Sequence, residues 1–398
     1  MQVKFQTIEG KSLQFYLLVA ALALLIVPGL YSTWRMYEDG IYLSGMTNRI
    51  PWGLQIILCV FYIGASAGSL VISSLYGIFG KIEYKPFARI AVYLALLFLI
   101  AALLSILTDL GRLDNLTASA SYFNFLSMLS INPFLYNTYI LICIVYLWAM
   151  LREKERFVRV IAVVAVVWAV LVHSGTGAIF GFVPRELYQS PLLPPSFITA
   201  ALSSGTALMI LVILGLFRLN RRPLDHELVV RLGRLLAVFI VIVLYFLFVE
   251  NAYRLYMADS REAACHFLFT PFNGTLFWGG LIVVGCIIPA VVLFHPRTGK
   301  STPWIVFSCV LTVFGVLCER YLIVIPGQTH PPELLPNMEI TSITELGAKY
   351  CLNEGIVHYT ASIHEVFQAV SVLALIGFMF VVGLRLFKLM PTEAKIYK

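Results

Sequence analysis

The sequence predicts an all-α polytopic membrane protein with about ten transmembrane helices. Of its 398 residues, 60% are hydrophobic and only 12% are charged, about half the charged fraction of a soluble protein. Apolar stretches of about 20 residues, long enough to cross a bilayer as a helix, recur along the whole chain. So little charge cannot cover a water-exposed body, and lipid is therefore the expected solvent for most of the molecule.

Ten apolar stretches are predicted to be spans. The first has no small-residue cleavage site after it, so we expect a retained helix rather than a cleaved signal peptide. The predicted spans are residues 13–33, 52–79, 86–108, 133–151, 157–181, 195–217, 231–257, 275–295, 303–326 and 362–387.

The basic residues predict the orientation of these spans. Of the 28 lysines and arginines, 20 fall on the side that holds both termini, six fall on the other side, and Arg254 and Arg320 fall inside spans. Because Lys and Arg concentrate in cytoplasmic loops, we expect a multi-pass protein of the cytoplasmic (inner) membrane with both termini in the cytoplasm. The net charge of +7 then reflects orientation, and no nucleic-acid partner is expected.

The outer loops are longer than the cytoplasmic ones and carry most of the exposed Asp and Glu. They fit either a docking surface for a soluble partner or a passive cap over the helix ends. Cys265 and Cys351 are the two of seven cysteines in outer loops, so they could form a disulfide in an oxidising compartment. No CxxC spacing occurs, which argues against a metal site held by thiolates.

An internal repeat is predicted in the chain. Two four-helix bundles, 52–181 and 195–326, would be flanked by an N-terminal helix with its outer loop (1–51) and by an outer loop with the C-terminal helix (327–398). Each bundle starts after a proline, and its first helix has an aromatic start and a small-residue middle, FYIGASAGSL from Phe61 and FITAALSSGTAL from Phe197. Small residues let membrane helices approach closely.

Seven ionisable residues are predicted to share one depth beneath the outer face. Ionisable side chains in a span are costly, so each is a candidate functional residue. Asp109 and Glu250 also occupy matching places in the two repeats, each followed by an arginine, Arg112 or Arg254. The seven predicted site residues are Asp109, His173, Glu250, Arg254, Arg320, His364 and Glu365.

A structural interpretation is open for several of these residues. Glu250 and Arg254 are four residues apart and could neutralise each other along one helix face. His364 and Glu365 could be interfacial residues at a helix start, where Glu favours the N-terminal dipole. A single buried histidine such as His173 is more often hydrogen-bonded within the fold than a ligand. Their common depth is what favours a function.

This layer of acids, arginines and histidines suits a reaction that moves protons. Quinol oxidation needs hydrogen-bond partners for the ring oxygens and groups that exchange protons, for which histidine and buried carboxylates are apt. We therefore expect bound menaquinone or ubiquinone, and neither haem nor metal in this chain. Two alternatives stay open: a cytochrome b-type anchor with one haem between His173 and His364, and a secondary transporter.

Five segments, in order along the chain, carry a resemblance to a known family. They are Tyr62–Ser69 (YIGASAGS), Thr108–Arg112 (TDLGR), Leu193–Phe197 (LPPSF), Glu319–Leu322 (ERYL) and the stretch leading into the last span, from His358 (HYTAS) to Glu365. With them the chain resembles the NrfD/polysulfide reductase membrane-subunit (PsrC) family, on the branch that includes HybB and DsrP.

The resemblance implies a haem-free, quinone-interacting subunit of a respiratory oxidoreductase complex. Its implied partner is an outer-face ferredoxin-like iron–sulfur protein, and a multihaem cytochrome and further membrane subunits also belong to such complexes. An assignment to anaerobic respiration or sulfur metabolism would rest on resemblance alone. Two departures from the family pattern are Leu113, where the family often has proline, and the few polar residues in the inner half of the spans, which do not favour proton translocation.

Overall fold

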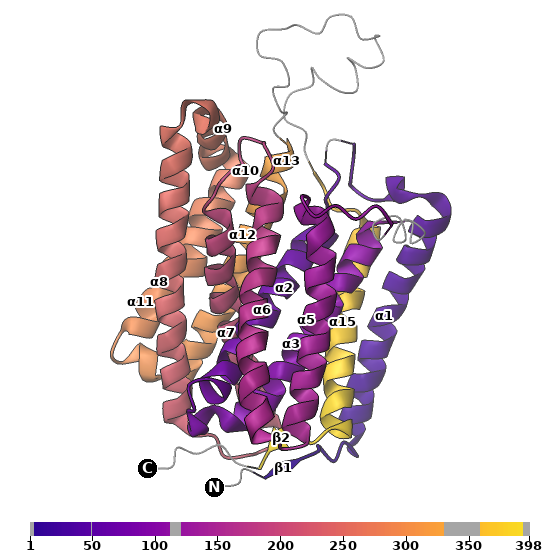
Figure 1. Cartoon of the computed structure of the whole chain (residues 1–398), viewed down its shortest axis with the longest axis vertical. Coiled ribbons are helices and arrows are strands. Elements are labelled where there is room, and N and C mark those ends of the chain that lie inside the picture. Colours follow the sequence, from indigo (N-terminus) through magenta and orange to yellow (C-terminus); the bar gives the residue numbers. More distant parts are fainter. Residues whose placement is uncertain (1–3, 49, 112–120, 330–358, 393–398) are drawn as a thin grey trace, which may run out of the picture.

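Ten helices within the described residues are long and apolar enough to cross a membrane. The structure is a computed structural model and describes residues 4–48, 50–111, 121–329 and 359–392. The long helices lie side by side in one bundle (Figure 1). At one end of it, β1 (Phe5–Gln6) pairs antiparallel with β2 (Met390–Pro391) and joins the two terminal segments. The predicted all-α polytopic fold is confirmed.

The spans follow the predicted order. The first five are α1 (Leu13–Asp39), α2 (Leu54–Gly77), α3 (Lys85–Asp109, preceded by the 3-10 turn Ile82–Tyr84), α5 (Met128–Leu151) and α6 (Glu155–Gly181). The other five are α7 (Leu193–Leu219), α8 (His226–Tyr256), a composite span of α10 (Pro271–Gly274), π-helical η4 (Thr275–Ile287) and α11 (Ile288–Phe294), then α12 (Thr302–Val324) continuing as α13 (Pro326–Thr329), and α15 (Ile363–Leu386). Two further 3-10 turns are η1 (Ile41–Leu43) and η5 (Thr298–Lys300).

Several boundaries differ from the sequence prediction by about five residues, among them the end of α1, at Asp39 rather than 33, and the start of α8, at His226 rather than 231. Helix α5 begins at Met128 rather than 133, with Pro133 inside it, because membrane helices tolerate proline where neighbouring groups satisfy the freed carbonyl. The predicted outer loop 258–274 is largely helical, with α9 spanning Ala258–Phe269. Its buried Ala263, Ala264, Phe267 and Leu268 form one face at helical spacing, which seats the segment on the bundle.

Helices α2 and α7 cross at the centre of the bundle through their small residues. A Cβ added to Gly68 would lie 2.5 Å from the Gly205 Cα atom, so the two backbones are in direct contact. The small-residue segments of both predicted repeats therefore meet each other, as close helix approach in lipid requires. The division of the chain into two repeated bundles stays a prediction.

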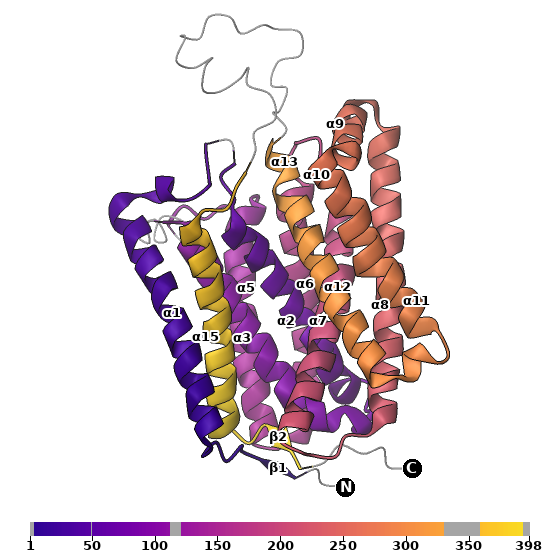
Figure 2. The same ribbon diagram turned by 180° about the vertical axis from the view of Figure 1, so that it is seen from behind.

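Helices α1 and α15 form a pair at one edge of the bundle (Figures 1 and 2). Gly29 of α1 gives room to Ser371 of α15, whose hydroxyl donates to the Ile26 carbonyl at 2.9 Å. The opposite face of α1 is open, with Leu24 71% and Leu30 64% exposed. Large exposed apolar side chains on a membrane helix are expected to face lipid.

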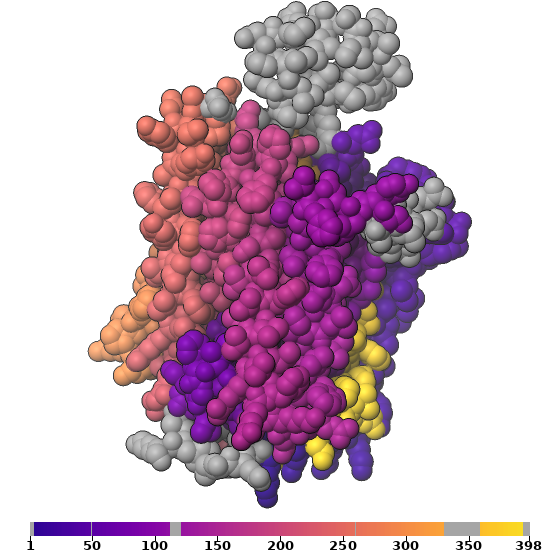
Figure 3. Space-filling view, in the orientation of Figure 1, coloured from indigo at the N-terminus to yellow at the C-terminus, as the bar shows by residue number. Residues whose placement is uncertain are grey.

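The space-filling view shows α5 and α6 covering the middle of one broad face (Figure 3). Exposed apolar side chains lie on both helices, including Leu141 at 62% and Val160 at 61%. Five of the seven predicted site residues, His173, Glu250, Arg254, Arg320 and Glu365, are instead buried.

Candidate functional site

The seven predicted site residues all lie toward the end of the bundle opposite the β1–β2 pair. Asp109 closes α3, Glu250 and Arg254 lie in the last two turns of α8, and Arg320 lies one turn before the end of α12. His173 lies about two turns before the end of α6, and His364 and Glu365 lie in the first turn of α15. The structure divides these residues between two clusters, centred on Glu365 and on Arg320.

The Glu365 carboxylate is surrounded by hydrogen-bond donors. It accepts from the backbone N–H groups of Gly45 (2.8 Å), Ser362 (2.8 Å) and Leu54 (3.3 Å) and from the Tyr359 hydroxyl (2.6 Å). A carboxylate has about four acceptor positions, so these contacts fill it. Ser362 and Glu365 also form a reciprocal capping box at the start of α15. Glu365 therefore fixes the segment before α2 to the start of α15.

Asp109 lies beside this carboxylate. The Gly53 N–H donates to Asp109, and the charges of Asp109 and Glu365 are close enough to interact. Its buried Oδ1 atom has no hydrogen-bond partner among the described residues. Such an atom is costly unless water or a ligand satisfies it. Asp109 is therefore the member of this cluster with free capacity to bind.

Tyr359 and His364 flank the Glu365 cluster. Burial and the neighbouring Glu365 raise the pKa of Tyr359 above its usual range, which keeps the phenol as a donor. The half-buried His364 ring places Nδ1 3.3 Å from the Ser32 hydroxyl of α1. His364 thus contacts the peripheral helix, while its neighbour Glu365 faces α2.

The Arg320 cluster is deeper and less satisfied. Arg320 and Glu319 are each 1% exposed, and their closest N–O distance is 3.9 Å, too long for a hydrogen bond. In the described part of the chain, Arg320 Nε and Nη1 and both Glu319 carboxylate oxygens are buried without a hydrogen-bond partner. Four unpaired atoms of charged groups in one place are rare in folded proteins and indicate a site for water or a ligand.

Glu250 and Arg254 adjoin this pair. Arg254 Nη2 donates to Glu250 Oε1 at 2.7 Å and to the Leu187 carbonyl at 2.6 Å. The alternative that these two residues neutralise each other along α8 is thus part of the observed arrangement. The negative charge of Glu250 is also close enough to Glu319 to repel it. The Glu250–Arg254 ion pair therefore lies beside the Arg320 cluster.

His173 is held between two backbone carbonyls. Its Nδ1 atom lies 2.7 Å from the Ala169 oxygen and its Nε2 atom 3.0 Å from the Ile63 oxygen of α2. A neutral imidazole carries one N–H, so only one of these contacts is then a hydrogen bond. The Arg320 charge acts on His173, which places the ring at the edge of that cluster.

Aromatic side chains connect the two clusters. Phe180 packs against Trp52 (centroids 5.5 Å apart), Tyr188 (5.4 Å) and Phe197 (5.8 Å). The Arg320 guanidinium carbon lies 4.4 Å from the Phe197 centroid, a cation–π contact. Trp52 directly precedes the segment that binds Glu365. We call Trp52, Phe180, Tyr188 and Phe197 the aromatic wall.

Gln328 holds one end of this wall in place. Its side chain accepts from the Trp52 N–H (2.9 Å) and donates to the Trp52 carbonyl (3.1 Å) and the Val324 carbonyl (2.7 Å). The Tyr188 hydroxyl also donates to the Val324 carbonyl at 2.5 Å, and burial raises the pKa of Tyr188. The end of α12 is thereby fixed to the start of α2.

Sequence reasoning missed three members of this arrangement as site residues: Glu319, Gln328 and Tyr359. Glu319 lies with Arg320 in the outer third of the predicted span, but only Arg320 was selected as a site residue. Gln328 and Tyr359 lie at predicted loop ends, where a polar residue carries no signal. Among the described residues, no group of three or more His, Cys, Asp or Glu side chains is arranged to hold a metal.

Some predicted features lie outside the described residues. Arg112, Leu113, Cys351 and His358 are among them. Cys265 is exposed on α9 and forms no disulfide with another described cysteine. Its disulfide with Cys351 therefore stays a prediction.

Comparison with known proteins finds a family across most of the chain. The family described as polysulphide reductase, NrfD, matches residues 42–332. The Hdr-like menaquinol oxidoreductase integral membrane subunit of Archaeoglobus fulgidus is 40% identical over 397 residues, covering 99% of this chain and 98% of the relative.

More distant relatives cover about three quarters of the chain. The menaquinone reductase integral membrane subunit of Nitratidesulfovibrio vulgaris is 22% identical over 331 residues, covering 76% of this chain and 79% of the relative. The protein NrfD of Escherichia coli is 24% identical over 314 residues, covering 71% of this chain and 96% of the relative.

Proposed function

Because the chain belongs to the polysulphide reductase NrfD family, we propose that it is the quinone-interacting membrane subunit of a respiratory oxidoreductase complex. It would exchange electrons between a membrane quinol and an iron–sulfur partner at the outer face. Two relatives are named for menaquinol or menaquinone, which favours menaquinone over ubiquinone as the substrate.

The observation that carries this proposal is the set of unpaired buried polar atoms at the two ends of the aromatic wall. Arg320 Nε and Nη1 supply donors, while Glu319 and Asp109 Oδ1 supply acceptors. A quinone ring is flat and apolar on its faces, and its two oxygens accept hydrogen bonds when oxidised and donate them when reduced. The wall suits the ring faces, and the unpaired atoms suit its oxygens.

The residues of the site would have different roles in quinol oxidation. The quinone itself supplies two-electron, two-proton redox chemistry. Arg320, held by Phe197, would orient an oxygen of the ring, and Glu319 or Asp109 would take a proton from a hydroxyl. Glu250, Arg254 and His173 would position the Arg320 cluster, and His364 and Glu365 would hold α15 and the segment before α2 in place.

The partner would dock at the end of the bundle that holds this site. Helix α9 lies at that end (Figure 1), with Arg261, Glu262 and His266 exposed on it. The excess of basic residues on the opposite side favours a location in the cytoplasmic membrane with both termini in the cytoplasm. The site would then open to an outer-face iron–sulfur subunit, in a complex that also holds a multihaem cytochrome or further membrane subunits.

The two alternative functions gain no support from the geometry. A backbone carbonyl oxygen lies within 3.0 Å of each His173 ring nitrogen, so the position that a haem iron would need beside either nitrogen is occupied. His364 contacts α1 rather than α6. The charged clusters lie toward one end of the bundle, whereas transporter sites lie near the midplane.

The test uses the complex purified with its partner subunits. Glu319→Gln keeps the shape of the side chain and removes an acceptor and proton carrier. We expect reduction of the iron–sulfur partner by a menaquinol analogue to fall about 100-fold or more, the effect typical of losing a general acid or base. Glu227→Gln, which removes an exposed acid paired with Arg231 at the other end of the bundle, is the matched control.

Extraction of quinone from the same preparations completes the test. Bound menaquinone in the wild type and less of it in Glu319→Gln is the expected result. Unchanged turnover in Glu319→Gln, or a complex that neither binds quinone nor passes electrons from quinol, would contradict the proposal.

A further inference from the structure

A charged cavity of about 510 Å³ lies at the end of the bundle opposite the candidate site. Its lining comes from the ends of the spans: Tyr76 near the end of α2, Lys85 at the start of α3, Leu151 at the end of α5 and Glu155 at the start of α6. These helix ends mark the level at which a bilayer gives way to its headgroups.

The terminal segments close one side of this cavity. Phe5 of β1 stacks under the Arg89 guanidinium, whose carbon lies 3.8 Å from the ring centroid. Arg89 also donates to the Lys388 carbonyl at 3.1 Å and to Glu153 at 3.2 Å. Arg89 is 7% exposed, and its contacts with Phe5 and with the Lys388 carbonyl hold both terminal segments against α3.

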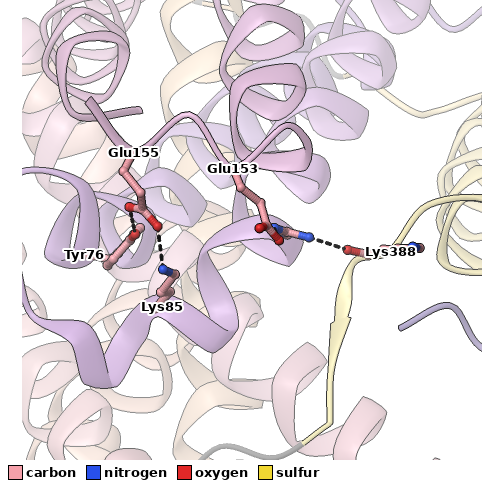
Figure 4. Close-up of polar contacts among 6 residues, drawn as sticks. Tyr76, Lys85, Glu153, Glu155 and Lys388 are labelled. Carbon is pink, nitrogen blue, oxygen red and sulfur yellow. Dashed lines mark hydrogen bonds and ion pairs between the residues drawn. The ribbon is translucent and has the colours of Figure 1, made fainter. Parts of the chain in front are cut away.

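The cavity carries an excess of positive charge. Four basic residues line it (Lys4, Lys85, Arg89 and Lys388), against two acids (Glu153 and Glu155). Figure 4 shows Glu155 bonded to Tyr76 and Lys85 on one side and, on the other, Glu153 and the contact of Arg89 with the Lys388 carbonyl. Lys85 is paired with Glu155 at 2.6 Å, and Glu153 is paired with Arg89. Both carboxylates are thus already paired with basic side chains of α3.

Two ammonium groups remain without a counter-ion. Lys4 and Lys388 form no ion pair within the described residues. Lys4 is held at the rim because its carbonyl accepts from the Thr392 N–H at 3.0 Å. A neighbouring cavity shares Tyr76, Lys85 and Glu155 and adds Arg159 to its lining.

The lining also has an apolar floor that continues toward the lipid-facing surface. Ala88, Met150 and Val158 contribute to the floor, and Ile82, which lines the neighbouring cavity, is 60% exposed. Close by, Lys154 lies over the Trp148 ring at 4.5 Å, the kind of aromatic and basic pairing found at a membrane interface.

We propose that this cavity binds the phosphate group of an anionic ligand, with Lys4 and Lys388 as its direct partners and Arg89 as a positioning residue. The apolar floor and the position at the helix ends favour the headgroup of an anionic lipid as the source, since basic pockets between membrane helices on the cytoplasmic side suit such headgroups. A free phosphate shares the same chemistry. The site is separate from the candidate quinone site and does not depend on it.

The test compares two double variants of the full chain in its complex, reconstituted in phosphatidylcholine nanodiscs. Lys4→Gln/Lys388→Gln removes the two unpaired charges of the cavity. Lys11→Gln/Arg297→Gln removes the same charge from exposed positions at the same end. Each preparation is titrated with phosphatidylglycerol and, separately, with inorganic phosphate, and retained lipid is counted by native mass spectrometry.

We expect the cavity variant to bind phosphatidylglycerol about 25-fold more weakly, from about fivefold per lysine near the surface, and the control to bind like the wild type. A third variant, Glu153→Gln, removes an acid that is 69% exposed on its side chain and should strengthen binding about fivefold.

The two titrations separate the sources of phosphate. Loss of phosphatidylglycerol binding alone identifies a lipid site, and loss of a phosphate-induced thermal shift alone identifies a site for free phosphate; either supports the proposal. Equal binding by the wild type and the cavity variant, or equal losses in both double variants, would overturn it. An unchanged melting temperature of the cavity variant without ligand shows that folding is not the cause.

Discussion

The Arg320 guanidinium carbon lies 4.4 Å from the centroid of the Phe197 ring, and both side chains are buried. Helices α12 and α7 thus place a fixed charge on an aromatic face at the depth where both Glu319 carboxylate oxygens lack a hydrogen-bond partner among the described residues. A buried charge without hydrogen-bond partners is expensive. A polar ligand or water that supplied the missing hydrogen bonds would offset this cost.

Replacing Arg320 by lysine should separate charge from geometry. Lysine keeps the positive charge but loses the planar group and the Nε and Nη1 donors. We expect quinol-dependent turnover of the purified complex to fall about 10- to 100-fold, the worth of one or two hydrogen bonds to a charged group. Arg231→Lys, in the exposed pair with Glu227, should leave turnover unchanged; equal effects of both variants would remove Arg320 from the site.

Gly68→Ala should destabilise the bundle by about 1–3 kcal/mol, the usual cost of overpacking. The added methyl would meet the Ala201 carbonyl and the Gly205 Cα atom, and backbone cannot move aside as a flexible side chain can. Gly215→Ala, on the partner helix α7, adds a methyl with nothing within 4 Å. Thermal unfolding in detergent measures both. A Gly68→Ala protein as stable as Gly215→Ala would show that the helices do not cross as closely as described.

Glu365→Gln should lower stability by about 1–3 kcal/mol, because an amide NH₂ cannot accept from the donors that one carboxylate oxygen now satisfies. The affected donors include the Gly45 and Ser362 N–H groups. Unfolding midpoints are compared with Glu262→Gln, an exposed acid on α9. If turnover falls in Glu365→Gln while stability does not, Glu365 binds substrate rather than holding the segment.

Thiol labelling should report the orientation and the disulfide together. Cys265 is exposed, whereas Cys59, Cys143, Cys286, Cys309 and Cys318 are buried. In the Cys351→Ser variant, we expect a membrane-impermeant maleimide to label Cys265 from outside intact cells and not in inside-out vesicles. The wild-type protein should be labelled only after reduction if Cys265 and Cys351 are paired. Labelling confined to inside-out vesicles would reverse the orientation.

The sequence predicted the spans better than the segments that connect them. Helix positions followed from apolar length, and the small residues around Gly68 and Gly205 predicted close helix approach. That α2 and α7 approach each other came from the structure. The helical segment α9 was not predicted, because its single buried face is too short and too polar overall to stand out from a loop.

The candidate site was predictable in depth but not in its contacts. Counting residues from a helix end gives the depth of His173 or Glu365, since rise per residue is constant. Whether Glu365 faces Gly45 or an open site depends on the rotation of α15 and on where a distant segment folds back. The four donors around Glu365 and the contact of His364 with Ser32 are of this kind.

The sequence by itself thus determined that most of the molecule faces lipid, where the spans lie and at what depth the charged residues lie. Hydropathy, helix length and charge count all follow from the order of residues along the chain. The tertiary structure alone decided that the Glu365 carboxylate has all its acceptor positions occupied, whereas Glu319, Arg320 and Asp109 have atoms without a hydrogen-bond partner among the described residues. It also decided that Trp52, Phe180 and Phe197 form one wall. Those outcomes depend on which faces of α3, α7, α12 and α15 turn toward one another, and packing in three dimensions sets that rotation.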